Sequence, residues 1–151
     1  MGSLTEADGK SKTTDKETFM SDNLRAPALL LARVLLAIIF VVSGYGKIMG
    51  YAGTMAYMTS HGLPAAQILL PLTILVELGG GLLLILGLFT RQVALLIFLF
   101  LIPVTLVFHT SGEKMDQLML MKNLSTMGGM LALAVAGAGA WSLNVRRRGG
   151  A

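Results

Sequence analysis

The chain of 151 residues contains no cysteine at all. It therefore forms no disulfide, has no thiolate nucleophile and offers no cysteine ligand to an iron–sulfur cluster. Any electron or thiol chemistry would have to come from a partner protein or from a bound cofactor. Histidine ligands for a metal are also few, because the chain has only two histidines, His61 and His109. We expect no metal site, and no catalytic residue can be assigned from the sequence.

Charged residues are scarce as well, at 13% of the sequence, whereas a soluble protein carries about 25%. Half the usual charge is too little to coat a water-facing surface. This composition argues against a soluble enzyme, a disordered protein and a nucleic-acid-binding protein. The net charge of +4 is no evidence for nucleic-acid binding, because the basic residues flank apolar segments, as they do in membrane proteins. We expect no nucleic-acid partner.

Long apolar runs are abundant instead, and four of them follow one another, at residues 28–49, 65–89, 93–108 and 124–143. A helix needs about 20 apolar residues to cross the hydrocarbon of a bilayer. Three runs reach that length, and none of the four has the polar face that a helix on a soluble protein would show. The sequence predicts an all-α protein, a transmembrane four-helix bundle whose first partner is the lipid bilayer. The connection that holds Tyr51, Met55 and Met58 is either a short interfacial helix or an ordinary loop.

The chain divides into three parts by composition. Residues 1–26 are polar and mixed in charge, which predicts a solvated, disordered tail. Pro27 stands where the first helix is expected to begin, and residues 27–145 form the transmembrane domain. Residues 146–151 are a basic tail. An even number of spans leaves both termini on one side, and the excess of lysine and arginine there places both in the cytoplasm.

Glu77 is the most informative single residue, because it lies near the middle of the second apolar run. A charged group at that depth costs about 2.5–3.5 kcal/mol on insertion scales, so it needs protonation or a basic partner. Arg33 in the first run is the expected partner. The Arg33–Glu77 pair would either fix the packing of two helices or form the polar core of a ligand or proton site.

A second polar group is expected near the opposite ends of the helices from the termini. A histidine and a lysine beside an apolar pocket can hydrogen-bond the carbonyl oxygens of a quinone and supply protons to them. The alternative is that these side chains only anchor the helix ends at the membrane surface. The candidate ligand-binding residues are Tyr45, Lys47, His109, Lys122 and Asn123.

Taken together, the order of several short motifs resembles the DoxX family of small bacterial and archaeal membrane proteins. The resemblance covers about residues 28–145. The motifs are Arg33, 43–47 (SGYGK), 61–64 (HGLP), 77–81 (ELGGG), 86–91 (LGLFTR), 108–109 (FH), 122–124 (KNL), 128–129 (GG) and 137–143 (GAGAWSL).

The resemblance implies a multi-pass protein of a bacterial or archaeal plasma membrane. Founding archaeal members look like a small subunit of a membrane thiosulfate:quinone oxidoreductase, and mycobacterial relatives are tied to a complex that links thiol handling with superoxide detoxification. It thus implies a redox-linked subunit of a membrane oxidoreductase complex that interacts with a quinone. The family's polar motif positions correspond here to Arg33, Lys47, Glu77, His109, Lys122 and Asn123. The absence of cysteine argues against direct thiol exchange by this chain.

Three functions therefore stay open. The leading one is a quinone-interacting subunit of a membrane oxidoreductase complex. The second is a non-enzymatic adaptor or assembly factor, and the third is a small-molecule carrier in which Glu77 relays protons. Each implies a protein partner in a membrane complex or a homo-oligomer.

Overall fold

The computed structural model describes residues 6–109 and 112–143, and every regular element among them is a helix. The elements are α1 (Glu6–Met49), α2 (Tyr51–Ser60), α3 (Ala66–Ile74), a π-helical turn η1 (Leu75–Gly79), α4 (Gly80–Leu86), α5 (Thr90–Phe108) and α6 (Lys114–Ala136).

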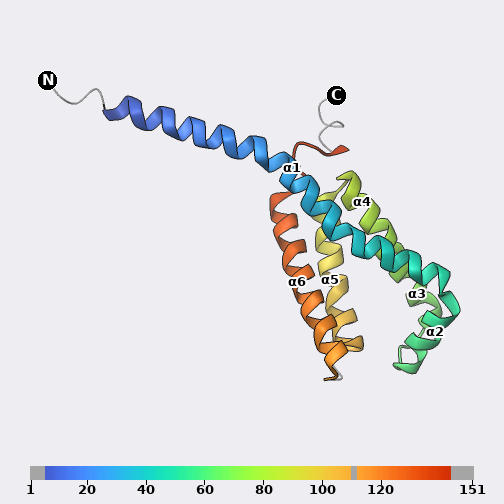
Figure 1. Ribbon diagram of the computed structural model, residues 1–151. Helices are drawn as coiled ribbons and strands as arrows, with labels where there is room; N and C mark the ends of the chain where they lie inside the picture. The colour runs from blue at the N-terminus through green and yellow to red at the C-terminus, as the bar shows by residue number, and fades with distance from the viewer. Residues whose placement is uncertain (1–5, 110–111, 144–151) are drawn as a thin grey trace.

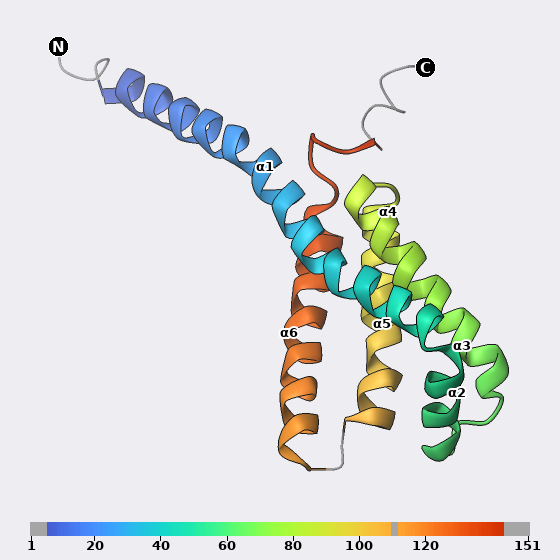
Figure 2. The same ribbon diagram turned by 45° about the vertical axis from the view of Figure 1, so that its right-hand side comes forward.

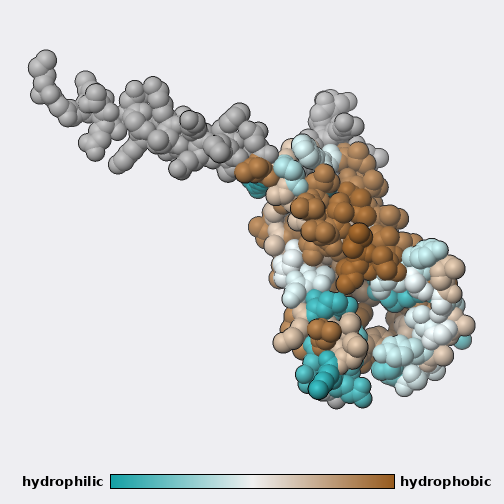
Figure 3. Space-filling view, in the orientation of Figure 1, coloured by the Kyte–Doolittle hydropathy of each residue, from teal (hydrophilic) through white to brown (hydrophobic). Residues whose placement is uncertain are grey.

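Four helical segments are long and apolar enough to cross a membrane, at Leu24–Met49, Ala66–Leu86, Thr90–Phe108 and Lys114–Ala136. The second of these is composite, because α3, η1 and α4 follow one another without a break. The predicted all-α, four-span architecture is confirmed. Figure 3 shows the consequence on the surface, a broad hydrophobic band across the bundle with polar side chains gathered at its lower end.

The predicted bounds of the fourth span are wrong at both ends. The prediction was 124–143, whereas α6 begins at Lys114 and ends at Ala136. Gly137 and Gly139 both adopt positive φ, at 79° and 74°, which ends the helix because this region suits glycine and not a continuing α-helix. Trp141 therefore lies on a non-helical segment after α6.

The start of α1 also differs from expectation, because the helix begins at Glu6 and Pro27 lies inside it. Its apolar part begins at Leu24. The division into a tail, a membrane domain and a basic tail stays a prediction, and residues 146–151 lie outside the described residues. The segment after α1 is a helix, α2, rather than an ordinary loop.

In both ribbon views α5 and α6 run side by side, and α1 passes obliquely across the bundle toward α2 and α3 (Figures 1 and 2). The core between these helices is apolar and includes the fully buried Ala37, Leu84, Ile97 and Met130. α1 enters at the end where the chain after α6 leaves the bundle, as four spans require.

Glycines set how α1 meets the composite second span. A Cβ on Gly44 would lie 2.8 Å from the backbone nitrogen of Leu78, and one on Gly81 would lie 2.8 Å from Cγ2 of Val41. One on Gly87 would meet the guanidinium of Arg33. These contacts fix an antiparallel register, since positions earlier in α1 lie opposite positions later in the second span. Close approach through small residues is the usual way in which helices pack in lipid.

Candidate functional site

An ion pair between Lys47 and Glu77 lies at the centre of the candidate site. The Lys47 Nζ donates to both carboxylate oxygens of Glu77, at 3.0 Å to Oε1 and 2.7 Å to Oε2. It also donates to the hydroxyl oxygen of Ser43, one turn earlier on α1, at 2.7 Å. The side chain of Glu77 is 8% exposed and that of Lys47 is 24% exposed. The lysine thus supplies the basic partner that an acidic group at this depth requires.

Glu77 sits in the middle of the π-helical turn η1. A π turn inserts one extra residue into a helix and so redirects the side chains around it, and such turns are frequent at functional sites. The turn joins α3 to α4 without ending the span. Glu77 is the buried residue of this turn and contacts α1 through Lys47.

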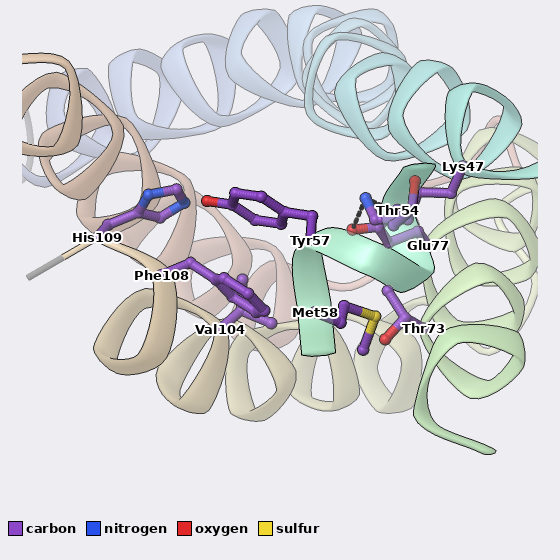
Figure 4. Close-up of a pocket in the computed structure, with 9 residues that line it drawn as sticks. All are labelled: Lys47, Thr54, Tyr57, Met58, Thr73, Glu77, Val104, Phe108 and His109. Carbon is purple, nitrogen blue, oxygen red and sulfur yellow. Dashed lines mark hydrogen bonds and ion pairs between the residues drawn. The ribbon is translucent and has the colours of Figure 1, made fainter. Parts of the chain in front are cut away.

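A cavity of about 210 Å³ opens beside this pair, and we call it the aromatic cavity. Its walls come from α1, α2, α3, η1 and α5, so residues far apart in the sequence meet there. Tyr57 and Phe108 stack with ring centroids 5.5 Å apart and an interplanar angle of 18°. Figure 4 shows the lining residues, which are Lys47, Thr54, Tyr57, Met58, Thr73, Glu77, Val104, Phe108 and His109.

A second cavity of about 130 Å³ borders the same ion pair, and we call it the polar cavity. It shares Lys47, Glu77, Val104 and His109 with the aromatic cavity. Its remaining lining residues come from α1, α5 and α6, and they are Ile39, Phe40, Ser43, Leu101, Lys122, Asn123 and Thr126. The ion pair and His109 therefore border both cavities.

His109 follows the last residue of α5 and is 19% exposed. Its Nδ1 is buried without a hydrogen bond, and it lies 3.7 Å from the Oδ1 of Asp116 on α6. That distance is too long for a direct hydrogen bond and short enough for electrostatic attraction. Figure 4 shows the imidazole at the opposite end of the aromatic cavity from the ion pair.

Asn123 ties α6 to α5 at the polar cavity. Its Nδ2 donates to the Oγ1 of Thr105 at 2.9 Å, and both residues are buried. Lys122 precedes it and is exposed while still lining the cavity. The structure thus brings together four residues that the sequence had proposed for ligand binding, namely Lys47, His109, Lys122 and Asn123.

The expected contact between Arg33 and Glu77 is not made. Arg33 is fully buried, but its Nη2 donates to the carbonyl oxygen of Trp141, and its Nε and Nη1 have no hydrogen-bond partner among the residues that the structure describes. The helical register explains the error. Arg33 lies opposite Gly87, which is ten residues beyond Glu77 and therefore about 15 Å along the helix axis. The buried acid takes its partner from the other end of α1.

Tyr45 and His61 lie outside both cavities. Tyr45 is 59% exposed on the outer face of α1. His61 is exposed too and packs beside the rings of Tyr57 and Phe108, with centroids at 4.3 and 5.2 Å. Within the described residues, no cluster of three or more histidine, cysteine, aspartate or glutamate side chains is placed to hold a metal ion.

Sequence reasoning missed several cavity residues, among them Thr54, Tyr57, Thr73, Phe108 and Thr126. These are ordinary residues of helices with few polar side chains. Only the packing of their helices around the ion pair gives them a place in a site.

Comparison with known proteins agrees with this architecture. The sequence profile of the DoxX family matches residues 28–110. The chain belongs to the DoxX family. It is 45% identical over 117 residues to the inner membrane protein YqjF of Escherichia coli strain K12, an alignment that covers 77% of this chain and 88% of the relative. It is 34% identical over 128 residues to the inner membrane protein YphA of the same strain, covering 81% and 91%.

The matched segment of this DoxX protein contains α2, η1 and the whole of the aromatic cavity. No solved structure matches the chain. The names of both relatives state a membrane location and no activity, so the function has to be argued from the site itself.

Proposed function

We propose that this DoxX protein is a subunit of a membrane oxidoreductase complex and binds the head group of a quinone in the aromatic cavity. One observation carries the proposal: Lys47 with Glu77, and His109, are polar groups at opposite ends of a small cavity walled by stacked aromatic rings (Figure 4). A quinone ring has the matching pattern, an apolar flat face with a carbonyl oxygen at each of two opposite positions.

The size of the cavity supports a single ring. A dry cavity of about 150 Å³ in another protein accepts benzene, and the aromatic cavity measures about 210 Å³. Pockets for whole drug-sized ligands run from about 300 to 1,000 Å³, so only a head group is expected inside. The long apolar tail of a quinone would then lie among the lipid chains. Figure 3 shows a hollow between α2 and the part of the bundle where α5 ends and α6 begins, and both α2 and α5 contribute lining residues to the cavity.

In the proposed complex, different side chains contact different parts of the quinone ring. The Lys47 ammonium has three N–H donors, and it gives them to Oε1 and Oε2 of Glu77 and to the Ser43 oxygen. In the proposed complex the donor now directed at Ser43 turns to one carbonyl oxygen of the quinone, while the ion pair with Glu77 stays. The His109 imidazole can donate to the other oxygen and can carry a proton. Tyr57 and Phe108 stack on each other and together supply one apolar wall of the cavity.

A quinone takes up two electrons and two protons when it is reduced. This chain has no cysteine to carry electrons, so in the proposed complex the electrons come from a redox-active partner subunit. The role of this chain is to hold the ring, to exclude water from its faces and to keep protons at Glu77 and His109 within reach of its oxygens. The same arrangement makes the subunit the membrane anchor for its partner.

The test of binding uses the full-length protein in lipid nanodiscs and decylubiquinone, a short-tailed quinone. We expect saturable binding, and we expect His109→Ala to raise the Kd about two- to tenfold, because one hydrogen bond contributes about 0.5–1.5 kcal/mol. Tyr45→Ala is the matched control, since this aromatic side chain is exposed and lies outside the cavity. Absence of saturable binding, or an unchanged Kd in His109→Ala, contradicts the proposal.

Purification from the native membrane tests the partner. The chain is isolated in mild detergent, and the proteins and lipids that accompany it are identified by mass spectrometry. A near-stoichiometric redox protein together with quinone supports the proposed redox subunit. A near-stoichiometric partner with no redox group and no quinone supports an adaptor or assembly factor instead.

A further inference from the structure

We propose that the polar cavity is a water-filled chamber through which protons reach Glu77 from the end of the bundle where α5 ends and α6 begins. The inference rests on the proposed function in one respect only, that the proton is finally passed to a quinone in the aromatic cavity. The chamber itself follows from the polar lining of the cavity, which includes both members of the ion pair.

The first argument is that the polar cavity is large enough and polar enough to hold water. A water molecule occupies about 30 Å³ of liquid, so a cavity of about 130 Å³ has room for about four. A buried water also needs two to four polar partners. Polar side chains line this cavity from three helices, with Ser43 and Lys47 on α1, Glu77 on η1, and Asn123 and Thr126 on α6.

The second argument is that these groups have bonding capacity left. The Ser43 oxygen accepts from Lys47 and keeps its own hydroxyl proton free to donate. The Thr126 hydroxyl donates to the Lys122 carbonyl oxygen at 2.8 Å and keeps its lone pairs. The Asn123 amide donates to Thr105 and keeps its carbonyl oxygen. Each of these three side chains can therefore make a further hydrogen bond to a water molecule in the chamber.

The third argument is the outer end of the chamber. His109 borders the cavity, and its buried Nδ1 lies 3.7 Å from the partly exposed Asp116, a gap that a bridging water closes. The exposed Lys122 lies on the same wall. The polar groups thus run from the surface to the interior in the order Asp116, His109, chamber water and Glu77.

The proton steps balance without any change of electrons. A chamber water gives one proton to the carboxylate of Glu77, and it is replenished with one proton from the His109 imidazolium. The imidazole then takes a proton from bulk water beside Asp116. Glu77 passes its proton to the ligand oxygen in the aromatic cavity and returns to the carboxylate that Lys47 holds. In this sequence only O–H and N–H bonds form and break.

The lack of native cysteine makes accessibility measurable with single-cysteine variants. Each variant of the full chain is reconstituted into nanodiscs and treated with a small anionic methanethiosulfonate, which modifies thiols that water reaches. We expect Thr126→Cys and Ser43→Cys to react at least tenfold faster than Ala94→Cys. Ala94 is the matched control because it is small, helical and 0% exposed in the apolar core.

A second substitution tests the route. Thr126→Leu places a larger apolar side chain in the chamber wall, and in this background we expect the reaction of Ser43→Cys to fall about tenfold. Circular dichroism and the elution volume confirm that the variants are folded. A Ser43→Cys rate equal to that of Ala94→Cys shows a dry cavity and overturns the proposal. A rate unchanged by Thr126→Leu shows that water arrives by another route and also overturns it.

Failure of the chamber and failure of quinone binding are separate results. The labelling rates are measured without quinone, so they report the chamber alone. Thr73→Cys lies in the aromatic cavity and not in the polar cavity, so added decylubiquinone is expected to protect it while Thr126→Cys stays reactive. If added quinone stops the labelling of both Thr73→Cys and Thr126→Cys, the ligand also occupies the polar cavity. That result overturns the proposal that the aromatic cavity binds the ligand while the polar cavity holds water.

Discussion

Gly87→Ala is expected to lower the free energy of unfolding by about 3 kcal/mol, the sum of two separate effects. Gly87 ends α4 with φ of 70°, and a residue with a side chain pays about 1–2 kcal/mol in this left-handed region. The added Cβ would also overlap Nη1 of Arg33 and lie 2.6 Å from Cβ of Ser142. Overpacking of this kind costs about 1–3 kcal/mol. The measurement is reversible unfolding in mixed micelles, followed by circular dichroism as the fraction of denaturing detergent rises.

Two other glycines separate these effects. Gly62 has φ of 72° and no atom within 4 Å of an added Cβ, so Gly62→Ala should cost only the backbone term, about 1–2 kcal/mol. Gly128 lies inside α6 with open space around it and no positive φ, so Gly128→Ala should be neutral or stabilising by up to about 1 kcal/mol. Equal losses at Gly87 and Gly62 would show that the Arg33 contact has no part in the effect.

Arg33 joins separate parts of the chain because it lies beside Gly87 at the end of α4. A guanidinium at the C-terminal end of a helix interacts favourably with the helix dipole, and Arg33 packs against Gly87 just after α4. Its bond to the Trp141 carbonyl ties the segment after α6 to the same point. Arg33 therefore joins three parts of the chain at one end of the bundle, while Lys47 serves the ion pair fourteen residues further along α1.

The four spans were predictable because hydropathy over twenty residues is a strong signal, and helices alone can cross lipid without unsatisfied backbone groups. The end of α6 was not, because residues 137–143 are nearly as apolar as the helix. Two glycines with positive φ, and not a change of polarity, end it at Ala136. Local backbone conformation at a glycine is set by tertiary contacts that a hydropathy pattern does not contain.

The partner of Glu77 was mispredicted for a related reason. Opposite charges in two apolar helices predict a pair, but the pair forms only if the helical register brings them level. The register here depends on close contacts at Gly44 and Gly81, and on the π turn that aims Glu77 at Lys47. The sequence identified the right residue types, while the aromatic cavity depends on α2 folding back beside α3 and α5, and the polar cavity depends on the packing of α6 against α1 and α5.

Lys47→Met is expected to lower the free energy of unfolding by about 3 kcal/mol, because it leaves Glu77 charged, buried and without its partner. Breaking a buried ion pair costs about 3–5 kcal/mol. The lower end applies because a quarter of the lysine side chain is exposed, so water already compensates part of its charge. The same detergent titration measures the loss, with Tyr45→Ala as an exposed control on the same helix.

Adding Glu77→Gln to Lys47→Met should restore most of that stability, since a neutral pair of similar volume removes the unpaired charge. The double variant then separates the two roles of the pair. If the pair only fixes α1 against the second span, the stable double variant still binds decylubiquinone with the affinity of the original chain. If the pair holds the ligand, the double variant is stable and its Kd rises at least tenfold, because hydrogen bonds to charged groups contribute about 1.5–3 kcal/mol. A double variant that stays as unstable as Lys47→Met would mean that the lysine stabilises the bundle through its contact with Ser43 or through packing, and not through the charge of Glu77.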